Sequence, residues 1–137
     1  MIQQYEIHLP AFRKGYHLIT HLIMEKIGKL PEKGLAHIFI KHTSAAISIN
    51  ENADPSVRYD FESFLNKLIP ENDPIYTHTL EGSDDMPAHL KSSLLGQSIT
   101  IPIRNWRLDL GTWLGVYLCE FRQHGGSRTI LITIMGE

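Results

Sequence analysis

Histidine and carboxylate side chains are unusually dense in residues 77–89 of this chain. The ligand-type side chains of this stretch, called the loop cluster below, are His78, Glu81, Asp84, Asp85 and His89. Imidazoles and carboxylates are the groups that most often bind zinc and other divalent ions, and they also serve as general acids and bases. The loop cluster is therefore the first candidate for a functional site.

A second polar group surrounds a short apolar run. His42, Thr43 and Ser44 precede this run, and Asn50 and Glu51 follow it. Hydroxyls and amides at the end of a strand can hold a phosphate or a metal-bound water, although they are also ordinary turn formers. A lone histidine there is more often a hydrogen-bonded structural residue than a ligand. We expect this group and the loop cluster to form the walls of one pocket.

Three histidines can together form an open metal site. His78 and His89 are eleven residues apart, which matches no compact zinc motif. We expect His42 to join them, so that three imidazoles hold a zinc or magnesium ion and leave a position for water or substrate. Asp85 is explained as a helix cap, whereas Asp84 is the better candidate for a ligand, a base or a group that orients an imidazole. Protonated imidazoles could instead bind phosphate.

Further charges lie towards the C-terminal end of the chain. Glu120 falls in an apolar segment, where a buried carboxylate is costly unless it is paired. Arg122 stands two residues later on the same face of a strand, so a structural ion pair is an alternative to a catalytic role. Residues 124–128 are interpreted as a hairpin loop in which the glycine amides and Arg128 could also receive an anion.

Size and composition exclude several classes of function. The length of 137 residues fits one domain, residues 1–137, and the 42% of hydrophobic residues can bury a core without disulfides. The formal net charge is −2 and the basic residues are scattered, which argues against nucleic acid as a partner. No signal peptide or apolar run of about 20 residues is present, so no membrane association is expected. The lone Cys119 in an apolar run fits a reduced, cytoplasmic compartment.

Hydrophobic periodicity predicts the elements that position these groups. Alternation indicates strands, spacing of three and four residues indicates helices, and Asp54 before Pro55 is typical of a helix start. Strands are expected at 2–9, 35–40, 46–49, 97–103, 113–121 and 128–135, and helices at 18–27, from Pro55 to Pro70 and from Asp85 to Gly96. The segment 46–49 is expected to neighbour 35–40, and residues 71–85 form a long loop. This order favours an antiparallel-rich α+β domain.

The C-terminal strand predicts an oligomer. Ile130, Ile132 and Ile134 alternate with a second face that includes Leu131 and Met135, so neither face is strongly polar. A domain of this size would struggle to cover both faces by itself. We therefore expect contacts between subunits to cover the second face.

Motifs along nearly the whole chain resemble those of the YjbQ family of small proteins. They are His42-Thr43-Ser44-Ala45-Ala46, Asn50-Glu51-Asn52-Ala53-Asp54-Pro55, His78 with residues 81–89, Leu110-Gly111-Thr112-Trp113 and Gly125-Gly126-Ser127-Arg128. The resemblance implies an α+β domain with β-sandwich character that assembles as a homotrimer. It also implies activity as a secondary thiamine-phosphate synthase, which condenses a pyrimidine pyrophosphate with a thiazole phosphate.

The resemblance also carries over a set of polar positions. They are His42, Thr43, Ser44, Asn50, Glu51, His78, Asp84, Asp85, His89, Trp113, Glu120 and Arg122. The sequence departs from the family pattern at Trp106, where the family usually has glycine, and at Leu114, where it has glutamine. A change from glycine to tryptophan alters both backbone freedom and bulk.

These observations favour a small metal-assisted enzyme that acts on a phosphorylated small molecule. In this hypothesis His42, Asp84 and Glu120 carry the catalysis, while His42, His78 and His89 hold the ion. The residues expected to contact the substrate are Thr43, Ser44, Asn50, Glu51, Trp113, Arg122 and Arg128. Two alternatives stay open: a module that binds an anionic metabolite without chemistry, and a structural role in which the polar groups bond across a trimer interface.

Overall fold

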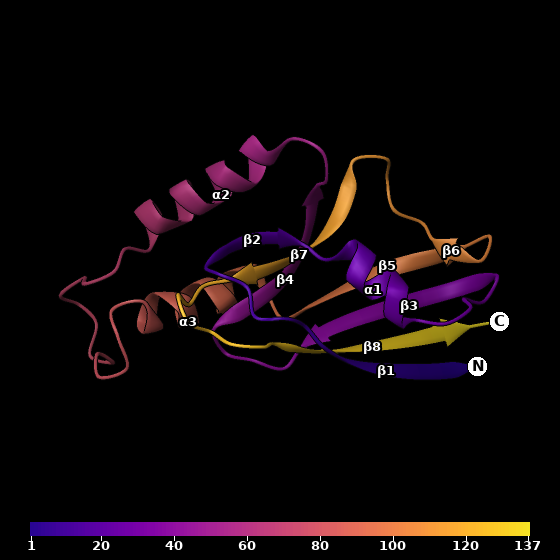
Figure 1. Ribbon diagram of the computed structural model, residues 1–137, viewed down its shortest axis with the longest axis horizontal. Helices are drawn as coiled ribbons and strands as arrows, with labels where there is room; N and C mark the ends of the chain where they lie inside the picture. Colours follow the sequence, from indigo (N-terminus) through magenta and orange to yellow (C-terminus); the bar gives the residue numbers. More distant parts are fainter.

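Two antiparallel sheets form the body of the protein, seen in a computed structural model that describes residues 1–137 (Figure 1). One sheet has five strands in the order β1-β8-β3-β5-β6, and the other has three in the order β2-β7-β4. The strands are β1 Ile2–His8, β2 Gly15–Leu18, β3 Lys33–Ile40, β4 Ala45–Glu51, β5 Ser98–Arg104, β6 Arg107–Leu108, β7 Leu114–Glu120 and β8 Thr129–Gly136. The α+β class and the antiparallel sheets are confirmed.

The two sheets pack their inner faces together. Ile130, Ile132 and Ile134 alternate along β8 and are all buried on the inner face of the five-stranded sheet. Val116 and Leu118 of β7 join the same core cluster from the three-stranded sheet. Burying an aliphatic side chain of this size contributes about 1.5–3 kcal/mol, so alternation fixes which face of each strand points inward. The β-sandwich character is therefore confirmed.

Three helices complete the domain: α1 Thr20–Lys26, α2 Pro55–Leu68 and α3 Asp85–Leu95. The expected start of α2 is confirmed, because Asp54 Oδ1 accepts a hydrogen bond of 2.9 Å from the Ser56 amide. Figure 1 shows α2 at the edge of the molecule. Its half-buried Phe61 and Leu65 pack against the cluster that contains Tyr16 and Tyr117 of the three-stranded sheet, and none of its residues is fully buried. None of the helices combines the length and hydrophobicity needed to cross a membrane.

Strand pairing differs from the sequence-based expectation in two places. The strand β4 does not neighbour β3, because β4 pairs with β7 and β3 lies between β5 and β8. Residues 124–128 are not a hairpin loop, since they connect β7 in one sheet to β8 in the other. The short strands β2 and β6 were not expected at all, because two to four residues carry too little periodicity to be recognised.

The turn between β5 and β6 contains Trp106, one of the two positions where the sequence is expected to depart from the family pattern. Asn105 and Trp106 have φ angles of 55° and 61°, and they form the two-residue loop of a hairpin in which Arg104 pairs with Arg107. Positive φ at both central positions is the geometry of a type I′ turn, which favours asparagine followed by glycine. Trp106 therefore holds a backbone conformation that suits glycine better, while its side chain is exposed.

Candidate functional site

The loop cluster closes around Asp85, the first residue of α3, which is only 2% exposed. His78 Nε2 lies 2.7 Å from Asp85 Oδ2, and His89 Nε2 lies 3.1 Å from the same oxygen. One ligand atom from each of these three side chains lies within 4.8 Å of the other two. The spacing of four residues between Asp85 and His89 places both on one face of α3. Two imidazoles and a carboxylate therefore converge at the N-terminal end of α3.

The orientation of the His89 ring is set by the backbone before β4. His89 Nδ1 lies 3.0 Å from the carbonyl oxygen of Thr43. A carbonyl can only accept, so Nδ1 carries a proton and donates it. Nε2 is then the nitrogen available to a metal ion, and in the absence of an ion it can bond the Asp85 carboxylate only when it also carries a proton. A second hydrogen bond of this kind is what commonly orients a metal-binding histidine.

Arg122 fixes the carboxylates of the cluster. Its Nη1 donates to Asp85 Oδ1 at 2.6 Å, its Nε donates to Asp84 Oδ2 at 3.1 Å, and its Nη2 donates to the Glu81 carbonyl at 2.9 Å. The Gln123 amide also donates to Asp84 Oδ2, at 2.9 Å. Arg122 and Asp84 thus hold Asp85 in place, and their side chains are 25% and 12% exposed.

Both acidic side chains are held in the ionised form. Burial disfavours the charge of Asp85, but the hydrogen bond from His78 and the nearby charges of Arg122 and His89 outweigh it, so its pKa lies below the ordinary value. For Asp84, burial is likewise outweighed by the backbone hydrogen bond from Gln123 and by Arg122, which lowers its pKa. An ionised Asp85 is the form that could bind a cation.

His42 does not join the other two histidines. Its Nε2 accepts a hydrogen bond of 2.8 Å from the Thr129 amide. Burial, followed by the charge of Arg128, lowers the pKa of His42, which keeps the ring neutral and able to accept this bond. The structure therefore replaces the expected set of three histidines by His78, Asp85 and His89.

Asp85 was assigned by sequence to helix capping, but its side chain faces the two imidazoles instead. Asp84 stands at the N-cap position of α3, and its side chain makes no capping hydrogen bond. The signal for Asp85 was already present in the sequence, because Asp85 and His89 are four residues apart in a segment predicted to be helical.

Glu120 and Arg128 form an ion pair inside the protein. Arg128 donates from Nε to Glu120 Oε1 at 2.7 Å and from Nη2 to Oε2 at 2.6 Å, and the two residues are 4% and 0% exposed. Arg128 Nη2 also donates to Ser44 Oγ at 2.9 Å. The expected partner Arg122 contributes only its backbone amide to Glu120. Arg128 thus joins β7, β8 and the start of β4 rather than facing a substrate.

The remaining expected site residues lie elsewhere. The strand β4 has seven residues, so at about 3.4 Å per residue its two ends are roughly 20 Å apart. Ser44 precedes one end, whereas Asn50 and Glu51 lie at the other end, where the Asn52 amide bonds the carbonyl of the exposed Trp113. The expectation of one shared pocket is therefore wrong: only the half of the second polar group that contains Thr43 reaches the loop cluster.

A cavity of about 330 Å³ opens beside the loop cluster. It is lined by the connection between α2 and α3, including Asn72, Tyr76 and Ser83, and His78 forms part of its wall. Small-molecule sites commonly have volumes of about 300–1,000 Å³. The cluster therefore borders a space that is large enough for a small ligand.

Comparisons with known proteins agree with this fold over the whole chain. The family described as "UPF0047 protein YjbQ-like" matches residues 5–137. A relative from Salmonella typhimurium, "UPF0047 protein YjbQ", is 49% identical over 100% of both chains. The crystal structure of a YbjQ-like protein of unknown function from Sulfolobus solfataricus superposes with a TM-score of 0.86 at 27% identity, covering 100% of this chain and 99% of that one. A conserved hypothetical protein from Thermus thermophilus has a TM-score of 0.83 at 30% identity, covering 96% and 99%.

Proposed function

Since the chain belongs to the YjbQ-like UPF0047 family, we propose that it is a metal-assisted enzyme that acts on a phosphorylated small molecule at the loop cluster. The convergence of His78, Asp85 and His89 within 4.8 Å, beside a cavity of about 330 Å³, is the observation that supports this proposal. Two imidazoles and one carboxylate are a known donor set for catalytic zinc, and such a set leaves a position for water or substrate.

A bound divalent ion would polarise a phosphate oxygen or acidify a bound water. The surrounding residues would orient the ligands and exchange protons. Thr43 and Arg122 orient His89 and Asp85, respectively, through the contacts described above. His78 is the most exposed of the three ligands, and Glu81 lies 4.0 Å from its Nε2. Because Asp84 is bound to Arg122 and to a backbone amide, Glu81 is the carboxylate of the cluster best able to exchange a proton with a substrate.

The specific reaction that we propose is condensation of a pyrimidine pyrophosphate with a thiazole phosphate, in which the thiazole nitrogen bonds to the carbon that carries the pyrophosphate and the pyrophosphate leaves. Turnover should fall at least about 100-fold when a chelator is added or when His89 is replaced by alanine, because either change removes the metal-dependent step. His21→Ala, on the exposed side of α1, is the matched control and should keep full turnover. Product formation is measured by chromatography of the phosphorylated thiamine.

Two results would speak against this reaction. Turnover that is unchanged by both the chelator and His89→Ala would place catalysis outside the loop cluster. A phosphorylated ligand that raises the melting temperature without any turnover would instead support a binding protein without chemistry, because a ligand stabilises the native state by mass action alone.

We also propose that the chain assembles as a homotrimer through the outer face of the five-stranded sheet. The pairing register places Met135 between Ile2 and Leu35, and these side chains are 50%, 68% and 49% exposed. Leu131 and Phe39 form a second apolar pair on the same face. Gln4, Thr133 and His37 form a polar row between these two apolar groups. Exposed apolar side chains on the outer face of a sheet support its burial against another subunit.

A charge on this face should break the assembly. Met135→Glu is expected to shift the mass measured by light scattering from that of a trimer to that of a monomer, because a carboxylate would be buried without a partner. Met24→Glu, an equivalent change on the exposed side of α1, should leave the trimer intact. A monomer mass for the unmodified protein at micromolar concentration would contradict the proposal.

A further inference from the structure

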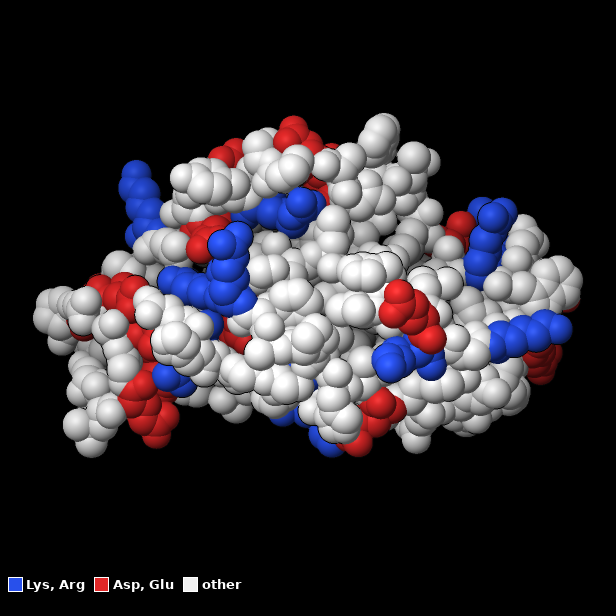
Figure 2. Space-filling model, viewed as in Figure 1, with Lys and Arg blue, Asp and Glu red and all other residues white.

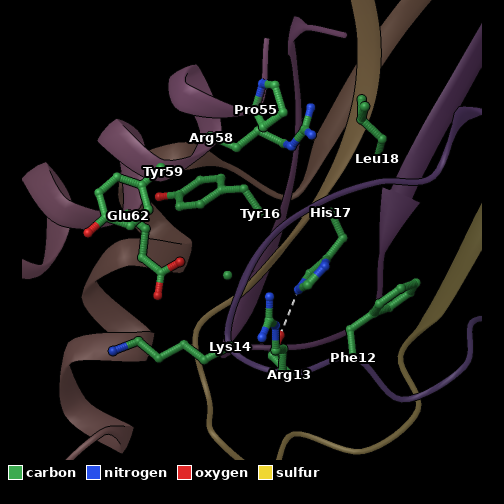
Figure 3. A pocket seen from close by; sticks show the side chains of 11 residues that line it. Phe12, Arg13, Lys14, Tyr16, His17, Leu18, Pro55, Arg58, Tyr59 and Glu62 are labelled. Carbon is green, nitrogen blue, oxygen red and sulfur yellow. Dashed lines mark hydrogen bonds between the residues drawn. The ribbon is translucent and has the colours of Figure 1, made fainter. Parts of the chain in front are cut away.

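A second and larger cavity lies on another part of the molecule. It has a volume of about 630 Å³ and lies between the segment that leads into β2 and the first turns of α2 (Figure 3). Its wall shares no residue with the loop cluster or with the cavity beside it. Basic and aromatic side chains dominate this wall: Phe12, Arg13, Lys14, Tyr16, His17 and Arg58.

The charge of this cavity is opposite in sign to that of the whole chain. Arg13, Lys14 and Arg58 line it together with a single carboxylate, that of Glu62, whereas the chain has a net charge of −2. None of these four side chains takes part in an ion pair. Figure 2 shows basic side chains gathered beneath α2 in the same view as Figure 1. A concave surface with unneutralised cations attracts anions.

Two hydrogen-bonding groups in the wall have no partner. Tyr16 Oη and Arg58 Nη1 are the only buried side-chain nitrogen or oxygen atoms in the structure without one. Tyr16 is 9% exposed, and burial raises its pKa, so its hydroxyl keeps its proton and stays a donor. Both atoms have almost no solvent-accessible surface, so they lie behind the wall of the cavity and do not face its open space.

The cavity also offers a flat apolar surface. The rings of Phe12 and His17 are stacked, with centroids 4.7 Å apart and an angle of 24° between their planes. His17 Nε2 is held by the Arg13 carbonyl at 2.7 Å, which fixes the orientation of this pair. In Figure 3, Arg58 lies on one side of the space, Arg13 and Lys14 lie on the other, and Phe12 and His17 border it. The N-terminus of α2 at Pro55 adds the positive end of a helix dipole.

We propose that this cavity is a second ligand site, which binds a small phosphate monoester that carries a flat ring. Arg58, Arg13 and Lys14 neutralise the phosphate, and the ring lies against Phe12 and His17. A phosphate dianion fits three cations better than a singly charged carboxylate does, because it offers two charges and three acceptor oxygens. The site is independent of the metal site proposed above.

Calorimetric titration of phenyl phosphate into the full-length chain tests this site. Arg58→Gln should weaken binding at least about tenfold, because a charge-assisted hydrogen bond is lost. Lys14→Gln should weaken it in the same direction, and it provides a second variant should Arg58→Gln unfold. Glu62→Gln should tighten binding a few-fold, because it removes the one repelling charge. Arg107→Gln, an exposed residue of β6 outside the cavity, is the control and should bind like the unmodified protein.

Three further titrations separate this site from its alternatives. Phenyl phosphate should bind more tightly than inorganic phosphate, which lacks the ring, and more tightly than benzoate, which carries one charge. His89→Ala should leave the affinity for phenyl phosphate unchanged. Equal affinity in Arg58→Gln, Lys14→Gln and the unmodified protein, or no detectable heat at millimolar ligand, would overturn the proposal. Loss of binding in His89→Ala would overturn it as well, by assigning the ligand to the loop cluster.

Discussion

Replacing Asp85 by asparagine is expected to weaken zinc binding at least about 100-fold, because it removes the only charged ligand from a set of three. Asparagine keeps the shape of the side chain and an oxygen that can accept from Arg122 Nη1, the donor that contacts Asp85 Oδ1 at 2.6 Å. The fold should therefore survive the change. Competition with a chromophoric chelator measures the affinity, and thermal unfolding verifies that the variant is folded.

Two neighbouring substitutions make this result specific. Asp84→Asn loosens the hold on Arg122 without removing a ligand, so we expect a smaller effect of about tenfold. Asp109→Asn removes an exposed acid that pairs with Arg104 of β5, away from the loop cluster. It should leave the affinity for zinc unchanged. Unaltered zinc binding in folded Asp85→Asn would show that Asp85 is not a ligand.

Glu120→Gln is expected to lower the free energy of unfolding by about 3–5 kcal/mol, the usual cost of leaving one partner of a buried ion pair uncompensated. Glu120 is fully buried and accepts two hydrogen bonds from Arg128, at 2.7 and 2.6 Å. Glutamine can accept only one of them, and it leaves the guanidinium charge without a counter-ion. The shift in the midpoint of urea denaturation measures the loss.

The same experiment has two comparison variants. Replacing both Glu120 and Arg128 by methionine should recover much of the lost stability, because a buried ion pair is often no more stabilising than apolar residues of similar size. Arg104→Gln breaks the exposed pair with Asp109 and should cost no more than about 1 kcal/mol. A loss below about 1 kcal/mol in Glu120→Gln would mean that the pair is solvated and not buried.

The sequence predicted the elements of this fold better than their neighbours in space. Asp54 before Pro55 encodes the start of α2 in local chemistry, and the alternation around Ile132 encodes which face of β8 is buried. Neither a helix-start motif nor an alternating pattern indicates which strand pairs with which. The strands β3 and β4 are both apolar and adjacent in sequence, yet they belong to different sheets, because periodicity reports the buried face and not the pairing.

The sequence predicted where the candidate site lies, but it predicted only some of the residues that form it. The density of ligand-type residues identified His78 and His89, whereas Asp85 was assigned to capping although it stands one helical turn before His89. His42 left the set because the Thr129 amide reaches its Nε2, a contact between residues distant in sequence. The pairing of Glu120 with Arg128 likewise depends on how the chain passes from one sheet to the other.

The cation-binding role of the loop cluster is tested most directly by an anomalous difference map at the zinc absorption edge, from crystals grown with zinc. One peak per chain is expected, about 2.0–2.2 Å from Nε2 of His78, Nε2 of His89 and a carboxylate oxygen of Asp85. Two results would contradict the account: a zinc peak at full occupancy elsewhere in the map, or no zinc peak at all. In both cases these three side chains would still be hydrogen-bonded to one another.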